Sequence, residues 1–289
     1  MLPRLIGPFH TYGLMLTIGF YAGWMMALRR ARKDGVEGKH ISDMLVYTVI
    51  SGIIGARVLY VILEWDSLTS FWEIFEVWRG GLVFYGGLAA GTVTLIIVIL
   101  RRKLSIAKIA DILGPPVALG LMFGRIGCFA YGCCWGDVAE ECPIAVRFPG
   151  ELVAMADGRL VPGEESSPAF TRHFYQYPDR FKDLGPGPAR SLPVVPTQPI
   201  SSADCLLIFL VTSFYFRFRR RYGEVFLLFC LLYSAHRFAI EIFRADNPVF
   251  LWGMTISQTL SIVLGIVCLV MLVRSRMLPA NVTAAKAPG

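Results

Sequence analysis

The stretch from Met254 to Val273, MTISQTLSIVLGIVCLVMLV, contains no charged side chain and decides the class of this protein. A helix needs about 20 apolar residues to cross the hydrocarbon core of a bilayer, and this stretch has that length. The whole chain of 289 residues is 55% hydrophobic with a mean hydropathy of +0.57, which is too apolar for a soluble globular protein. The sequence therefore predicts an integral membrane protein.

Six similar windows precede this stretch, so we expect an all-α membrane protein with about seven transmembrane helices. We expect residues 1–289 to form one membrane-embedded domain. A Pro115-Pro116 pair is expected to break the fourth helix, because proline removes a helical hydrogen bond. The windows lie near residues 12–29, 43–64, 81–100, 105–124, 203–220 and 223–243.

Basic residues cluster after the odd-numbered windows, as in Arg29–Lys33 and Arg101–Lys103. Because Lys and Arg favour the cytoplasmic side, we expect the N-terminus outside and the C-terminus in the cytoplasm. The net charge of +7 then reflects membrane orientation, and no nucleic-acid partner is expected. Residues 1–9 lack the basic and short apolar regions of a cleavable signal peptide, so the first helix should stay in the mature protein.

Residues 137–200 interrupt the helical pattern between the fourth and fifth windows. They hold ten of the 17 prolines, together with glycine, serine and charged residues. We expect an extramembrane insertion, placed by the charge rule on the outer, periplasmic face. There it could cover a lateral opening or contact a protein partner.

Several charged residues fall inside the predicted spans, namely Arg57, Asp111, Arg237, Glu241 and Arg244. A charge at mid-membrane costs at least about 2.5 kcal/mol, so such residues face the bundle interior and are functional by default. Arg237, Glu241 and Arg244 have the i, i+4, i+7 spacing of one helix face. We favour Arg237 as a substrate ligand, whereas the other two also fit a self-neutralising ion-pair ladder.

Residues 124–136, GRIGCFAYGCCWG, form the densest cluster of unusual residues. Four glycines in this segment predict irregular backbone at membrane depth, which is tolerated where it lines a cavity. Arg125 lies within it and presents the planar fork that matches phosphate oxygens. The alternative is that Arg125 extends to the membrane interface.

These residues together resemble the prolipoprotein diacylglyceryl transferase family. The resemblance runs from about His10 to Ser261 and is strongest over residues 124–136. The chain departs from the family pattern at Tyr85, where a His-Gly-Gly motif usually has histidine, and at Cys128 and Cys133, where the signature usually has Asn and Glu. Supporting matches are Ala110-Asp111-Ile112, Tyr12-Gly13, Gly86-Gly87, Pro196-Thr197-Gln198, Arg237 to Arg244 and Thr255 to Ser261.

The resemblance implies an enzyme of the bacterial cytoplasmic (inner) membrane with its active site toward the outer face. Its substrates would be phosphatidylglycerol and the lipobox cysteine of a preprolipoprotein signal peptide, joined as a thioether with release of glycerol phosphate. No cofactor or metal is expected. The implied catalytic residues are Arg125, Arg237, Tyr85 and Tyr12, and further substrate-binding residues are Glu241, Arg244, Gly86, Gly87, Gly127, Gly136, Gln198 and Tyr233.

Chemistry suggests a role for most of these groups. Fixed cations such as Arg125 and Arg237 would stabilise a leaving phosphate and also lower the pKa of the attacking thiol. A dedicated base is then expected to contribute little. Tyr85 suits hydrogen-bond donation, and we rank His236 as a packing residue first and a base second.

Three other classes of protein share some of these features. A small-anion or lipid transporter would explain intramembrane arginines, but the chain lacks the internal repeat of many transporters. A thiol-redox or metal protein built on Cys128, Cys133, Cys134 and Cys142 is possible, although their spacing lacks paired CxxC motifs. A retinal-type receptor is disfavoured because the seventh window has no lysine.

Overall fold

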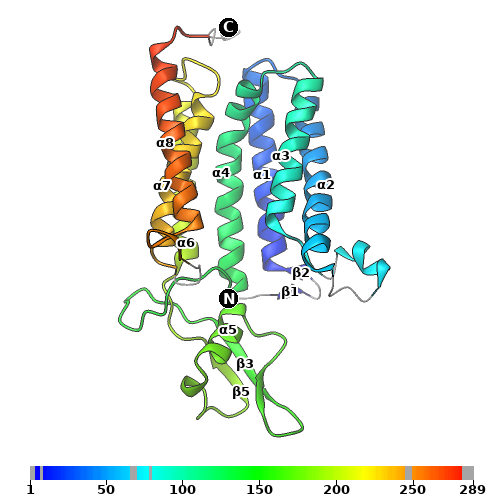
Figure 1. The fold of residues 1–289 in the computed structure, drawn as a ribbon, viewed down its shortest axis with the longest axis vertical. Helices are drawn as coiled ribbons and strands as arrows, with labels where there is room; N and C mark the ends of the chain where they lie inside the picture. The colour runs from blue at the N-terminus through cyan, green and yellow to red at the C-terminus, as the bar shows by residue number, and fades with distance from the viewer. Residues whose placement is uncertain (1–3, 7–8, 66–69, 78–79, 245–248, 282–289) are drawn as a thin grey trace. The chain divides into compact units, whose positions relative to one another are not determined.

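The computed structural model describes residues 4–6, 9–65, 70–77, 80–244 and 249–281 (Figure 1). It confirms a mostly helical membrane protein. Six helices of this part of the chain are long and apolar enough to cross a membrane, and α7 is a further long helix that carries three charged residues. The long helices are α1 (Thr11–Lys33), α2 (Gly38–Leu63), α3 (Phe84–Arg101), α4 (Ile106–Tyr131), α6 (Thr197–Tyr215), α7 (Glu224–Glu241) and α8 (Ile256–Met277).

Each long helix overlaps one window predicted from hydropathy, but α4 differs from the prediction at its proline pair. It continues through Pro115 and Pro116, so the predicted break was wrong. Close packing surrounds this turn: a Cβ on Gly23 would lie 3.3 Å from the Pro116 carbonyl oxygen, and one on Gly114 would lie 3.7 Å from Phe229 Cβ. Neighbouring helices therefore hold α4 in place, which is how membrane helices tolerate proline.

The chain divides into two compact units, one formed by residues 24–113 and the other by residues 1–23 and 114–281. In the first unit α2 and α3 run side by side (Figure 1). Glycines allow this contact, because a Cβ on Gly86 would lie only 2.4 Å from the Gly55 carbonyl oxygen. Beside this pair lies a core that includes Ala31, Met44 and Ile109.

Arg57 on α2 has a structural role in this unit. Its guanidinium donates hydrogen bonds to the carbonyl oxygens of Glu73, Ile74 (2.9 Å), Gly80 (2.8 Å) and Gly81 (3.0 Å). These bonds fix the segment that connects α2 to α3, which includes the short 3₁₀ helix η2 (Phe71–Phe75). Its donors are therefore engaged with backbone rather than directed at a ligand.

In the second unit α6, α7 and α8 pack together (Figure 1). Ala118 of α4, Ile208 of α6 and Phe229 of α7 form a shared apolar core. The helix α8 begins with a capping box, in which the Thr255 hydroxyl accepts from the Gln258 amide and the Gln258 side chain accepts from the Thr255 amide. Two short antiparallel pairs, β1 (Arg4–Ile6) with β2 (Phe9–His10) and β6 (Val249–Leu251) with β7 (Met254–Thr255), also belong to this unit.

The segment between α4 and α6 contains a small sheet that the helical periodicity did not predict. Its strands are β3 (Pro149–Ala154), β4 (Leu160–Pro162) and β5 (Gly187–Arg190), arranged antiparallel in the order β4-β3-β5. The helix α5 (Pro168–Gln176) packs on it through Phe170, with η4 (Pro178–Arg180) following. Leu152, Phe181 and Leu192 complete this core.

His173 of α5 makes this segment sensitive to pH. Its side chain is buried, and its Nδ1 accepts a hydrogen bond from the Leu192 amide at 3.2 Å. Burial lowers the pKa of His173 from the ordinary value of 6.5, so the unfolded segment binds a proton more readily than the folded one. The buried, neutral His173 side chain therefore contributes to the stability of the folded segment above pH 6.5, and this contribution is lost as the pH falls below that value.

We therefore expect amide exchange over residues 187–192 to accelerate as the pH falls from 7 to about 5, beyond the intrinsic pH dependence of exchange. Mass spectrometry of the purified protein measures this. The His173→Gln variant should show a flatter pH response, and an unchanged response would assign the effect to another group.

Candidate active site

The glycine-rich segment is helical for longer than expected. The helix α4 runs to Tyr131, so residues 124–131 are regular and the irregular backbone begins at Gly132, which has a φ of +81°. The buried Gly136 donates its amide to the Val195 carbonyl oxygen at 3.0 Å. The segment thus turns sharply at the end of α4 and runs against the chain that leads into α6.

Two residues at the start of α6 hold this turn. Thr197 Oγ1 donates to the Cys134 carbonyl oxygen at 2.8 Å, and Gln198 Nε2 donates to the Cys133 carbonyl oxygen at 2.7 Å. Gln198 is buried, and its Oε1 has no hydrogen bond to any residue that the structure describes. The predicted site residue Gln198 therefore supports the segment through its amide nitrogen.

The close packing at Gly136 gives a prediction about stability. An added Cβ would lie 2.7 Å from the Phe243 carbonyl oxygen and 2.8 Å from Thr197 Cγ2. We expect Gly136→Ala to destabilise the protein by about 1–3 kcal/mol, because backbone must shift to make room. Thermal unfolding in detergent measures the loss. The control is Gly185→Ala, where no heavy atom lies within 4 Å, and equal melting of the two variants would contradict the prediction.

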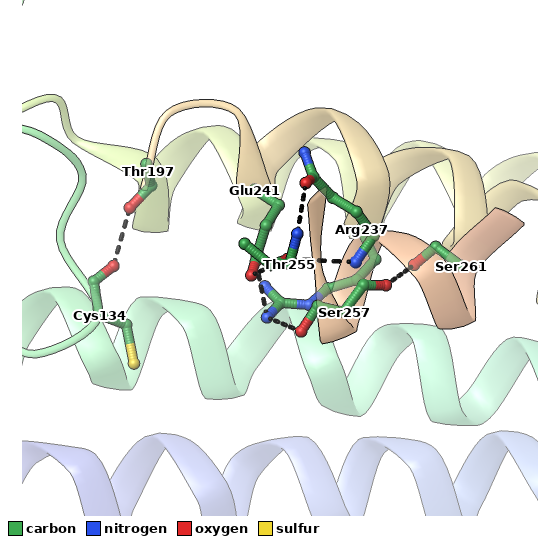
Figure 2. A network of polar contacts seen from close by, with 8 residues as sticks. Cys134, Thr197, Arg237, Glu241, Thr255, Ser257 and Ser261 are labelled. Atoms are coloured by element: carbon green, nitrogen blue, oxygen red, sulfur yellow. Dashed lines mark hydrogen bonds and ion pairs between the residues drawn. The ribbon is translucent and has the colours of Figure 1, made fainter. Parts of the chain in front are cut away.

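Arg237 and Glu241 form the centre of a polar network at the end of α7 (Figure 2). Arg237 Nη2 lies 2.8 Å from Glu241 Oε2 and donates to Ser257 Oγ at 3.0 Å. The buried Glu241 also accepts from Thr255 Oγ1 at 3.0 Å, which ties α7 to the start of α8. Arg237 Nη1 is buried without a hydrogen bond to any described residue, so one donor of the fork remains for a ligand.

Arg125 and Arg237 lie near the same imidazole, because His236 interacts electrostatically with both. Arg125 is half-buried, and no hydrogen bond or ion pair joins it to another residue within the described ranges. A guanidinium in this position carries five donors that favour a planar oxyanion. The two arginines therefore bring unsatisfied cationic donors to one region.

His236 has a partner that the sequence did not reveal. Its Nδ1 lies 3.0 Å from Asp204 Oδ2 of α6, and the imidazole is almost fully buried. Its Nε2 has no hydrogen bond to any residue in the described parts of the chain. A carboxylate at Nδ1 orients an imidazole and leaves Nε2 available, which is the arrangement of many histidine bases. Asp204 lies 32 positions away, so helical periodicity could not pair it with His236.

The other predicted residues of this unit surround the segment in different ways. Tyr12 of α1 packs on Tyr131 with ring centroids 6.4 Å apart and interacts electrostatically with Arg125. Gly127 allows α1 to approach, because a Cβ there would lie 3.0 Å from Tyr12 Cδ2. Tyr233 stacks on Phe229 at 5.9 Å, and its ring centroid lies 5.8 Å from that of His236.

Arg244 lies beyond the end of the helix that was expected to carry it. The helix α7 ends at Glu241, and Arg244 follows in a tighter turn in which its amide donates to the Glu241 carbonyl oxygen at 3.2 Å. Its side chain interacts electrostatically with Cys134.

Tyr85, Gly86 and Gly87 belong to the other compact unit. Tyr85 is 69% exposed at the start of α3, where its ring packs edge-on against Phe84 at 5.8 Å. Gly86 and Gly87 face α2, since a Cβ on Gly87 would lie 3.0 Å from the Gly52 carbonyl oxygen. These two glycines therefore serve helix packing.

Comparison with known proteins connects this geometry to a family. The family model for prolipoprotein diacylglyceryl transferase matches residues 3–274. The chain belongs to that family. Phosphatidylglycerol–prolipoprotein diacylglyceryl transferases of Citrobacter koseri and Escherichia coli O1:K1 / APEC are 31% and 32% identical over 284 residues, covering 93% of this chain and 90% of each relative. Phosphatidylglycerol–prolipoprotein diacylglyceryl transferase 2 of Clostridium perfringens is 27% identical over 254 residues, which cover 88% of this chain and 86% of the relative.

The family match includes every predicted site residue and the whole segment between α4 and α6. As a member of the diacylglyceryl transferase family, the chain is a membrane enzyme rather than a transporter or receptor.

Proposed function

We propose that this enzyme transfers the diacylglyceryl group of phosphatidylglycerol to the lipobox cysteine of preprolipoproteins. The thiol sulfur attacks the glyceryl carbon that bears the phosphate, a carbon–sulfur bond forms as the carbon–oxygen bond breaks, and glycerol phosphate leaves. The observation that carries the proposal is Arg237, which Glu241 and Ser257 fix in place while its Nη1 has no partner among the described residues, in a chain whose family match covers residues 3–274.

The charges suit this reaction. Negative charge grows on the leaving phosphate as the carbon–oxygen bond breaks, and fixed cations away from water stabilise that charge strongly. Arg237 is held in place by Glu241 and Ser257, and its buried Nη1 has no hydrogen-bond partner among the described residues, so this donor needs little reorganisation to bind an oxyanion that enters the site. We assign both arginines to the phosphate and Tyr12 to the edge of the same site.

The Asp204–His236 pair is the best candidate to accept the thiol proton. Its buried Nε2 has no hydrogen-bond partner among the described residues, and His236 interacts electrostatically with both arginines, which supports this role. Binding of the anionic lipid would offset the two cations, which would then favour a protonated imidazole. The role of Tyr85 as a hydrogen-bond donor stays a prediction from the sequence.

The direct test is a reaction with defined components. Purified enzyme is incubated with phosphatidylglycerol and a synthetic lipobox peptide, and mass spectrometry looks for the diacylglyceryl thioether and free glycerol phosphate. A peptide with serine in place of the lipobox cysteine is the control. Release of glycerol phosphate and diacylglycerol without peptide modification would indicate hydrolysis of the phosphodiester, as by a phospholipase C, and contradict the proposal.

We further propose that the active site faces the outer side of the bacterial cytoplasmic membrane. The basic clusters at the C-terminal ends of α1 and α3 and just after α6 favour a cytoplasmic position for those helix ends. A reporter fused after Gly289 should then be active in the cytoplasm, and one inserted at Asp157, in the exposed turn between β3 and β4, should be active outside. The reversed pattern would place the site on the cytoplasmic face.

A further inference from the structure

Three cysteine thiols meet at the end of α4. The Sγ atoms of Cys128, Cys133 and Cys134 all lie within 4.8 Å of one another, and each residue is half-buried. All seven cysteines of the chain are free thiols in the structure. Neither the phosphate site nor the proposed proton acceptor uses these three sulfurs.

The backbone is arranged so that the thiols converge. The Cys133 amide donates to the Cys128 carbonyl oxygen at 3.1 Å, which folds the chain back over the last turn of α4. Cys134 has a φ of +58°, a left-handed conformation that costs free energy in a residue with a side chain. Thr197 and Gln198 hold the carbonyl groups of Cys134 and Cys133 in place, so the convergence is built into the tertiary structure.

Three converging thiols suit one kind of ligand. With zinc–sulfur bonds of about 2.3 Å, a tetrahedral ion places its sulfurs roughly 3.8 Å apart, which small side-chain rotations of these cysteines would reach. Thiolates select ions such as Zn²⁺ and Cu⁺ over Mg²⁺ or Ca²⁺. Each thiol loses its proton on coordination.

We propose that Cys128, Cys133 and Cys134 form a binding site for one thiophilic d¹⁰ metal ion, with a fourth coordination position open. Binding depends on three sulfurs and releases their protons, so it weakens as the pH falls. The test of this site uses no activity measurement.

The test is a titration of the reduced, purified protein in lipid nanodiscs. Cd²⁺ is added while its ultraviolet thiolate charge-transfer band is followed, and Zn²⁺ is then used as a competitor. We expect saturation at one ion per chain and displacement by Zn²⁺. Cys128→Ser, Cys133→Ser and Cys134→Ser should each weaken binding by more than about tenfold, since even outer contacts of metal ligands contribute that much. The matched control is Cys142→Ser, which should bind like the parent.

A second measurement covers variants that fail to fold. Zn²⁺ should slow alkylation of the three cysteines in the unmodified protein, but not of Cys142, as mapped by peptide mass spectrometry. Absence of a saturable cadmium band would overturn the proposal, as would equal loss of binding in Cys142→Ser. The proposal would also be overturned if two of the three cysteines form a disulfide in the purified protein and the reduced protein then binds no metal.

Discussion

Arg125→Ala and Arg237→Ala should each lower diacylglyceryl transfer at least about a hundredfold, because removing one fixed donor to a developing oxyanion costs that much in other enzymes. Lysine at either position should restore little, since it loses the planar fork that binds two oxygens at once. The peptide assay described above measures the rates. Arg159→Ala is the control, because that arginine is exposed and pairs with the exposed Asp157.

Arg237→Ala needs a companion variant. Removing this arginine takes away the cation 2.8 Å from the buried Glu241 carboxylate, and loss of one partner of a buried ion pair can destabilise a protein by about 3–5 kcal/mol. The double variant Arg237→Ala/Glu241→Gln also removes the carboxylate charge, so we expect it to recover stability but not activity. Near-normal turnover in either single arginine variant would make that arginine structural and leave the phosphate without its proposed ligand.

His236→Gln should lower the transfer rate about a hundredfold or more, which is the usual contribution of a positioned general base. Asp204→Asn should have a smaller effect, because it disturbs the orientation of the imidazole and leaves the ring in place. The decisive measurement is the dependence of kcat on pH. In the unsubstituted enzyme kcat should fall at low pH, where the proton acceptor is protonated, and His236→Gln should lose this dependence.

This expectation differs from the one drawn from sequence, in which thiolate formation beside the arginines makes a base nearly unnecessary. The reason for the change is the Asp204 contact at 3.0 Å, which gives His236 an oriented ring. If His236→Gln retains near-parental rates and an unchanged pH profile, the thiol ionises without help from this pair. Thermal unfolding of the variant separates either result from simple loss of structure.

The sequence by itself determined the membrane class and the approximate bounds of the seven long helices. These features follow from a local property, hydropathy over about 20 residues. The Arg237–Glu241 pair was also accessible, because side chains four positions apart on a helix meet.

Only the tertiary structure decided which distant residues meet. The Asp204–His236 pair joins two helices, Arg57 binds carbonyl oxygens 16 to 24 positions away, and the cysteines converge because a turn is held from α6. The same holds for α4, whose proline pair is tolerated where other helices pack against it. Periodicity describes one helix at a time, whereas these contacts depend on how helices are placed beside one another, and that placement follows from packing over the whole unit.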